Sequence, residues 1–215
     1  MSKALILVGG GKGGVGKSLF SMAVVDFLES TGANPFLVET DTSVPDVFKT
    51  YRETVGGELV NLVESKQDNS IVINTGARNQ TGITNFGRTL RKALPELKRK
   101  LGVFWLIDRK RESLELLGDF AEALPEAEIH VVRNLYLGAE SKFELYNGSK
   151  MRTAIEKAGG RSLSFPELAD RVTDAMNKGR LTIAKACKEL SFGDRIEVER
   201  WRDECKEMLL EAIHE

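Results

Sequence analysis

Short apolar runs alternate with longer amphipathic segments along most of the chain. The β-rich runs occupy residues 4–8, 35–39, 70–74, 102–108 and 128–134, with a weaker one at 161–165. Continuous aliphatic runs of this length are typical of parallel strands that are covered on both faces. Segments of helical periodicity lie between them, at 18–30, 87–101 and 111–123. The alternation predicts an α/β fold of three layers, with a mainly parallel sheet and helices on both faces.

The pattern changes after Pro166, beyond which no strand-like run occurs. Three helical segments follow, at 167–178, 180–190 and 193–213. The sequence has no internal repeat, low-complexity tract or linker, so we predict one domain over residues 1–215, with a core (1–166) and a helical C-terminal extension (167–215). The least regular stretch, 48–68, is interpreted as an insertion.

Composition places the chain among globular proteins. It has 215 residues, of which 41% are hydrophobic and 29% charged, and a formal net charge of -1. That charge excludes the basic overall surface that binds nucleic acid unaided. No run has the length of a transmembrane helix, and the apolar stretch in MSKALILVGGG is too short for a signal peptide. We therefore expect a cytoplasmic protein with no membrane partner.

Cysteine and histidine are too sparse for a metal or thiol site. Cys187 and Cys205 lie far apart without a nearby histidine, and the two histidines are His130 and His214. These residues supply too few ligands for zinc and no Cys-His pair for nucleophilic catalysis. We expect two free thiols, and any metal would be Mg²⁺ held by oxygen atoms.

The residues that follow the first strand carry the clearest chemistry. Gly9–Ser18 reads GGGKGGVGKS, with six glycines and two lysines, and Gly11–Ser18 fits the pattern G-x-x-x-x-G-K-[ST]. Glycines allow backbone N–H groups to turn inward, and the next helix directs its positive end at an anion. Lys17 would reach the β- and γ-phosphates, and Ser18 would ligate Mg²⁺. The stretch predicts a nucleotide polyphosphate site.

The segment Lys12–Ser18 resembles the deviant Walker A motif, K-G-G-x-G-K-[ST], of the ParA/MinD superfamily of P-loop ATPases. The resemblance implies a P-loop NTPase fold, ATP and Mg²⁺ as cofactors, slow ATP hydrolysis and a homodimer that forms on ATP binding. It also implies that Lys12 reaches across the dimer to the partner's phosphates, while Lys17 serves its own subunit. The implied nucleotide-binding residues are Gly11, Lys12, Gly13, Gly14, Val15, Gly16, Lys17, Ser18 and Leu19.

An acidic pair follows the second strand. Glu39 and Asp41 match the acidic-x-Asp pattern of the superfamily's switch I. The resemblance implies that Asp41 positions the attacking water and, with Ser18, holds the Mg²⁺ shell, while Glu39 supports the loop or the metal-bound waters. The alternative is an exposed loop in which acidic residues merely cluster, and Asp46 fits that reading equally well.

The third strand departs from the superfamily at its end. In SIVINTG, Asn74 stands where the Walker B motif has an aspartate. An amide accepts a hydrogen bond from a metal-bound water but brings no negative charge. This leaves a second hypothesis open, a nucleotide-sensing module with little hydrolysis. On the sequence alone, Asn74→Asp is expected to accelerate a slow enzyme.

Two later features of the sequence concern recognition of the adenine base of ATP. Asn134 matches a late-strand asparagine with which several superfamily members read the adenine edge, although asparagine also commonly ends strands. The loop at Pro166 occupies the place of a loop that often lies over the base.

Three longer segments resemble one branch of the superfamily, the short ATPases of plasmid conjugation, mobilisation and stability (TraL, MobD or StbB type). They are GKGGVGKSLFSMAVVDFL, LVETDTSVPDVFK and VFWLIDRKRESLELL. The branch implies a role in plasmid transfer, partition or stability through a DNA-bound adaptor or relaxase-type protein. The basic stretch 87–100 either contacts DNA directly or is a solvated helix face, and we favour the second. A kinase-like or ligase enzyme ranks last, because no substrate pocket is recognisable.

Overall fold

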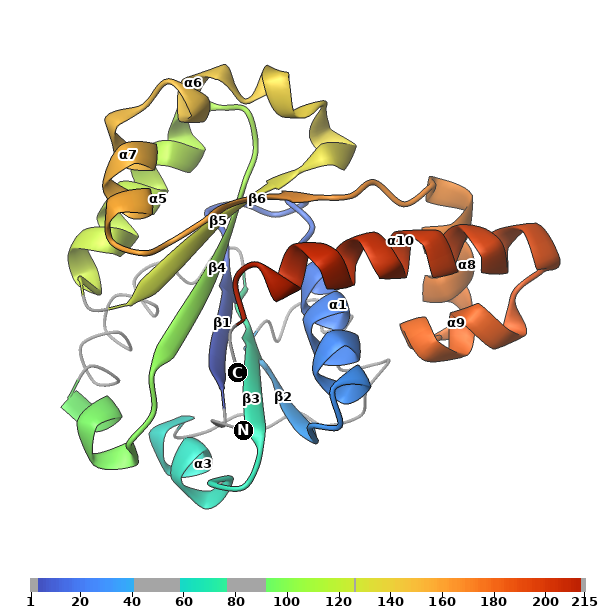
Figure 1. Ribbon diagram of the computed structural model, residues 1–215, viewed down its shortest axis with the longest axis horizontal. Coiled ribbons are helices and arrows are strands. Elements are labelled where there is room, and N and C mark those ends of the chain that lie inside the picture. Colours follow the sequence, from blue (N-terminus) through green and yellow to red (C-terminus); the bar gives the residue numbers. More distant parts are fainter. Residues whose placement is uncertain (1–3, 41–58, 77–91, 126, 214–215) are drawn as a thin grey trace.

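The computed structural model describes residues 4–40, 59–76, 92–125 and 127–213, and it shows a parallel sheet between two layers of helices (Figure 1). The described strands are β1 (Leu5–Gly9), β2 (Pro35–Glu39), β3 (Ser70–Asn74), β4 (Leu101–Ile107), β5 (Glu128–Asn134) and β6 (Ser162–Phe165). They form one sheet in the order β2-β3-β1-β4-β5-β6, with every neighbouring pair parallel. The predicted α/β class is confirmed.

The strand that precedes the glycine-rich segment lies inside the sheet. β1 pairs with β3 on one side and with β4 on the other. Because all strands are parallel, their carboxyl ends meet at one edge, where ligands of open α/β sheets commonly bind. The carboxyl ends of the described strands therefore lie at the same edge of the sheet as the glycine-rich loop.

The described α-helices divide between the two faces of the sheet (Figure 1). Those with residues in one apolar core are α1 (Lys17–Ser30), α8 (Asp170–Gly179), α9 (Ile183–Glu189) and α10 (Phe192–Leu210). Those with residues in the other core are α3 (Leu59–Ser65), α5 (Arg111–Ala123), α6 (Glu144–Asn147) and α7 (Lys150–Lys157). Two 3₁₀ turns, η1 (Leu135–Leu137) and η2 (Glu140–Lys142), follow β5.

One predicted helix is wrong at its end. Residues 92–97 are helical, but Lys98 has φ +51° and β4 already begins at Leu101, so the helix predicted over 87–101 stops early. Residues 87–91 lie outside the described residues. The segment predicted as irregular, 48–68, contains α3, and its residues up to 58 are not described.

The C-terminal helices pack against the helix that follows the glycine-rich loop. Trp201 of α10 is fully buried, and its Nε1 donates to the carbonyl of Pro166 at 2.9 Å. Arg202 donates from Nε and Nη2 to the two carboxylate oxygens of Asp26, at 2.7 and 2.9 Å. Because Asp26 is buried within α1, this bidentate pair connects α10 directly to the helix that follows the glycine-rich loop.

Arg202→Ala is expected to lower the free energy of unfolding by about 3 kcal/mol, because it leaves the carboxylate of Asp26 buried without its partner. Urea unfolding followed by circular dichroism measures the change. Arg200→Ala is the control, since Arg200 forms an exposed i,i+4 pair with Glu204 on the same helix. Its loss is expected to cost about 0.4 kcal/mol. Equal effects for the two variants would show that the Asp26 pair contributes no special stability.

Both cysteines are free thiols, as predicted. Desolvation by burial raises the pKa of Cys187 and, more strongly, that of Cys205, so both stay protonated at neutral pH. Within the described ranges, no helix combines the length and the apolar character that crossing a bilayer requires.

Candidate nucleotide site

The glycine-rich loop joins the carboxyl end of β1 to the amino end of α1. α1 begins at Lys17, directly after Gly16, whose φ of +97° lies in the left-handed region that glycine tolerates best. In the described part of the chain, no side chain caps this helix and its first turn carries no acidic residue. The first N–H groups of any helix have no acceptor within the helix, and the helix dipole favours an anion at this end.

Lys17 lies within the loop rather than in solvent. Its side chain is buried, and Nζ donates to the carbonyl of Lys12 at 2.8 Å. Ser18 and Leu19, in the first turn of α1, are each partly exposed. The loop thus accepts a hydrogen bond from one ammonium group at the start of a helix, an arrangement typical of phosphate-binding loops.

Lys12 forms an ion pair with Glu112, in the first turn of α5. Lys12 is 24% exposed and Glu112 is 60% exposed. The hydrogen bond that Lys12 donates to the carboxylate of Glu112 raises the pKa of Lys12, so the ammonium stays charged. Sequence reasoning did not find Glu112, because its approach depends on β4 lying next to β1. The predicted action of Lys12 across a dimer stays a prediction.

A buried polar network connects α1, β3 and β2. Glu39 and Asn74 are register partners at the ends of β2 and β3, and each is 2% exposed. Nδ2 of Asn74 donates to Oε2 of Glu39 at 2.8 Å, and Oδ1 of Asn74 accepts from the hydroxyl of Ser21 at 3.1 Å. Ser21 lies four residues after Lys17 on α1. Position 74 itself carries no carboxylate, but the carboxylate of Glu39 lies directly beside it in the neighbouring strand β2.

The ends of β2 and β3 are held together beyond this network. Thr40 donates its backbone N–H to the carbonyl of Asn74 at 3.0 Å, and its hydroxyl accepts from the N–H of Gly76 at 3.3 Å. Asp41 and Asp46, predicted to follow β2, lie outside the described residues. The oxygen atoms of Ser18 and Glu39 have the chemistry that Mg²⁺ prefers. Among the described residues, no cluster of three or more His, Cys, Asp or Glu suits a metal ion.

Asn134 ends β5 beside the loop and is 5% exposed. Its Nδ2 donates to the carbonyl of Val15 at 3.0 Å, and its Oδ1 accepts from the backbone N–H of Tyr136 at 3.1 Å. The structure therefore brings the predicted base reader into contact with the phosphate loop itself. Its pairing with adenine stays a prediction.

A cavity of about 510 Å³ lies beyond the end of β5. Its wall includes Leu135, the residue after Asn134, and Pro166, whose loop was predicted to lie over the base. The remaining lining residues are Ala139, Glu167, Ala169, Glu197, Arg200 and Glu204. Its volume is within the range of small-molecule sites.

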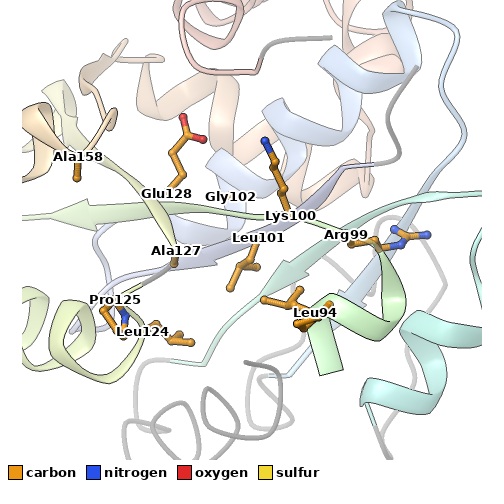
Figure 2. Close-up of a pocket in the computed structure, with 11 residues that line it drawn as sticks. Leu94, Arg99, Lys100, Leu101, Gly102, Leu124, Pro125, Ala127, Glu128 and Ala158 are labelled. Carbon is orange, nitrogen blue, oxygen red and sulfur yellow. The ribbon is translucent and has the colours of Figure 1, made fainter. Parts of the chain in front are cut away.

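A second cavity, of about 610 Å³, is lined by the amino ends of β4 and β5, at the edge of the sheet opposite the glycine-rich loop (Figure 2). Figure 2 shows Lys100 and Glu128 extending to the other side of the strands from Leu101 and Leu124. Arg99 is partly buried and donates from Nη2 to the carbonyl of Lys66 at 2.8 Å. This part of the basic stretch 87–100 is therefore not a uniform solvated face. None of the residues that line this cavity belongs to the glycine-rich loop.

Comparison with known proteins agrees with this geometry. No protein-family model matches the chain. The protein MobD of Acidithiobacillus ferrooxidans is 51% identical over 227 residues, which covers 100% of both chains. A solved structure of MinD with Mg-ADP from Pyrococcus horikoshii has a TM-score of 0.54 and 14% identity, over 97% of this chain and 96% of that one. The MinC:MinD complex of Aquifex aeolicus gives a TM-score of 0.51 and 12% identity, over 99% and 98%. The chain therefore belongs to the same family as MobD and has the fold of the MinD/ParA-type P-loop ATPases.

Proposed function

We propose that the chain is a MinD/ParA-type ATPase that binds Mg-ATP at Gly11–Leu19 and forms a homodimer when ATP is bound. The observation that carries the proposal is the buried ammonium of Lys17 inside a glycine-rich loop, at the uncapped amino end of α1. The MinD of Pyrococcus horikoshii, which has the same fold, was solved with Mg-ADP. The cavity beyond β5 would take the nucleoside end.

Each residue of the proposed site has its own role in binding or hydrolysis. Backbone N–H groups of the loop and Lys17 would bind the β- and γ-phosphates, and Ser18 would hold Mg²⁺ together with Asp41. When bound, Mg²⁺ neutralises charge on the phosphate oxygens. Glu39 would bring its carboxylate to the metal-bound waters. Lys12 would leave Glu112 and extend to the partner's γ-phosphate, where it stabilises charge that develops during transfer.

Mg-ATP is expected to convert the monomer to a dimer, as measured by light scattering coupled to size exclusion. A monomer at saturating Mg-ATP would contradict the proposed dimer.

Lys17→Ala is expected to weaken nucleotide affinity about a hundredfold, because it removes a charge-assisted hydrogen bond to the phosphates. Isothermal calorimetry with ATP measures this loss. Lys142→Ala is the control, since Lys142 lies in the exposed turn η2 and outside the segment Gly11–Leu19. Unchanged ATP affinity in Lys17→Ala would contradict the proposed nucleotide site.

A second candidate is a nucleotide-sensing module with little hydrolysis. The observation that favours it is Asn74, whose amide is engaged with Glu39 and Ser21 rather than supplying a charge. Turnover measured with and without plasmid DNA and candidate partner proteins separates the two. A rate that stays at the background level under every condition supports the sensor.

We further propose that the protein acts in plasmid transfer, positioning or stability through a DNA-bound adaptor or relaxase-type protein. The support is its 51% identity to MobD over the full chain. MinD, which has the same fold, binds another protein in the MinC:MinD complex. A relaxase from the same plasmid should then co-purify with the chain in Mg-ATP and separate from it in Mg-ADP.

A further inference from the structure

We propose that Asn134 is a positioning residue of the phosphate-binding loop, which it holds through the carbonyl of Val15. The inference rests on the proposed nucleotide site. It assigns to Asn134 a role that is independent of the base. The two residues are far apart in the sequence, and only the fold brings the end of β5 against the loop.

Both ends of the Asn134 amide are used within the protein. Nδ2 donates to the Val15 carbonyl at 3.0 Å, and Oδ1 accepts from the N–H of Tyr136 at 3.1 Å. The side chain is 5% exposed, and Val15 is 2% exposed. The amide is therefore anchored by η1 on one side and holds the loop on the other. A buried amide with two such bonds has a defined orientation.

The loop passes so close to Asn134 that its conformation depends on this contact. A Cβ atom on Gly16 would lie 2.4 Å from Nδ2 of Asn134. Gly16 also has φ +97°, which a side chain would strain. Position 16 therefore requires glycine for two reasons, and one of them is Asn134.

The bond to Val15 has a consequence for the anion site. The peptide between Val15 and Gly16 is planar and trans, so its carbonyl and its N–H point in opposite directions. By holding the carbonyl toward β5, Asn134 directs the N–H of Gly16 away from β5. That N–H belongs to the residue that precedes α1, where phosphate-binding loops present their donors. Asn134 thereby fixes the direction of one donor before any ligand arrives, which lowers the cost of ordering the loop.

The test compares ligands with and without a base. Asn134→Ala removes the donor to Val15, and Asn134→Asp removes it while keeping an acceptor for Tyr136. Both variants are expected to lose about tenfold in affinity for ATP, for GTP and for inorganic tripolyphosphate alike. Amide hydrogen exchange in the ligand-free loop is expected to become faster in both variants. Isothermal calorimetry and mass spectrometry provide the two measurements.

The matched control is Asn147→Asp. Asn147 likewise donates to a carbonyl, that of Glu140 at 2.9 Å, and accepts from Arg133 at 3.1 Å, but neither partner belongs to the glycine-rich loop. It is expected to keep wild-type affinity and wild-type exchange in the loop, so a general loss of stability is distinguishable from a loss of positioning.

Three results would overturn the inference. A loss confined to ATP would make Asn134 a base reader, and a loss in Asn134→Asp but not in Asn134→Ala would reflect only the added charge. Unchanged binding in both variants would leave the loop independent of Asn134. In each case the wild type still binds nucleotide, whereas failure of the proposed function itself would appear as no binding by the wild type. If Asn134→Asp does not fold, the neutral Asn134→Ala and Asn134→Ser decide.

Discussion

Lys12→Ala is expected to lower the rate of ATP hydrolysis about a thousandfold while leaving ATP affinity nearly unchanged. A positive charge supplied from the partner acts mainly on the transition state, so its loss reduces turnover more than binding. The contact between Lys17 and position 12 uses the backbone carbonyl, which alanine retains. Single-turnover hydrolysis and calorimetry with ATP measure the two quantities.

Two controls separate action across a dimer from action within one subunit. Glu112→Gln removes the charge that pairs with Lys12 but keeps both lysines, so hydrolysis should persist. Mixing Lys12→Ala with Lys17→Ala at saturating ATP should restore hydrolysis, because one subunit then offers an intact loop and the other supplies Lys12. If the mixture is as inactive as each variant alone, Lys12 does not serve a partner.

The sequence predicts the strands of this fold well, because each is a continuous apolar run buried on both faces. The bounds of β2, β3 and β5 agree with the predicted ones. The helix before β4 was predicted too long because its end is set by Lys98 in a left-handed conformation, which a basic stretch does not indicate. α7 was missed because its eight residues are mostly polar.

The candidate site is predicted only in part, for a physical reason. A loop motif is local in sequence, so the residues alone indicate a glycine-rich loop between a strand and a helix, which the structure has between β1 and α1. The contacts that hold this loop are not local. Asn134 reaches Val15 from another strand, and Glu112 reaches Lys12 from the start of α5. Such contacts follow from strand order, which hydrophobic periodicity does not determine.

The network around Asn74 also depends on strand order, and it reverses the effect that the sequence predicts for Asn74→Asp. From the sequence, an aspartate at position 74 would restore a missing charge and speed hydrolysis. In the structure, that carboxylate would lie where Nδ2 now donates to Glu39 at 2.8 Å, in a site almost closed to solvent. Two carboxylates in contact repel each other and lose a hydrogen bond. The amide at position 74 is therefore the residue type that suits a glutamate at the end of β2.

Asn74→Asp is accordingly expected to lower the free energy of unfolding by about 3 kcal/mol and to give no faster hydrolysis. Adding Glu39→Gln to Asn74→Asp should recover most of the lost free energy of unfolding. In the double variant an amide and a carboxylate face each other again, with the amide now on β2 and the carboxylate on β3. Urea unfolding of the two single variants and the double variant measures the coupling.

Asn69→Asp is the matched control for this cycle. Asn69 also donates from its side-chain amide, to the carbonyl of Asn34 at 2.9 Å, but it directly precedes β3, at the end opposite Asn74, and is partly exposed. There the new carboxylate stays in contact with water, so Asn69→Asp should lower the free energy of unfolding by only about 1 kcal/mol. A single Asn74→Asp variant as stable as the wild type, or a double variant no more stable than the single one, would mean that Glu39 and Asn74 do not act as a pair. Recovery in the double variant would mean that the two strand ends need one carboxylate between them, and that its position on β2 or β3 is interchangeable.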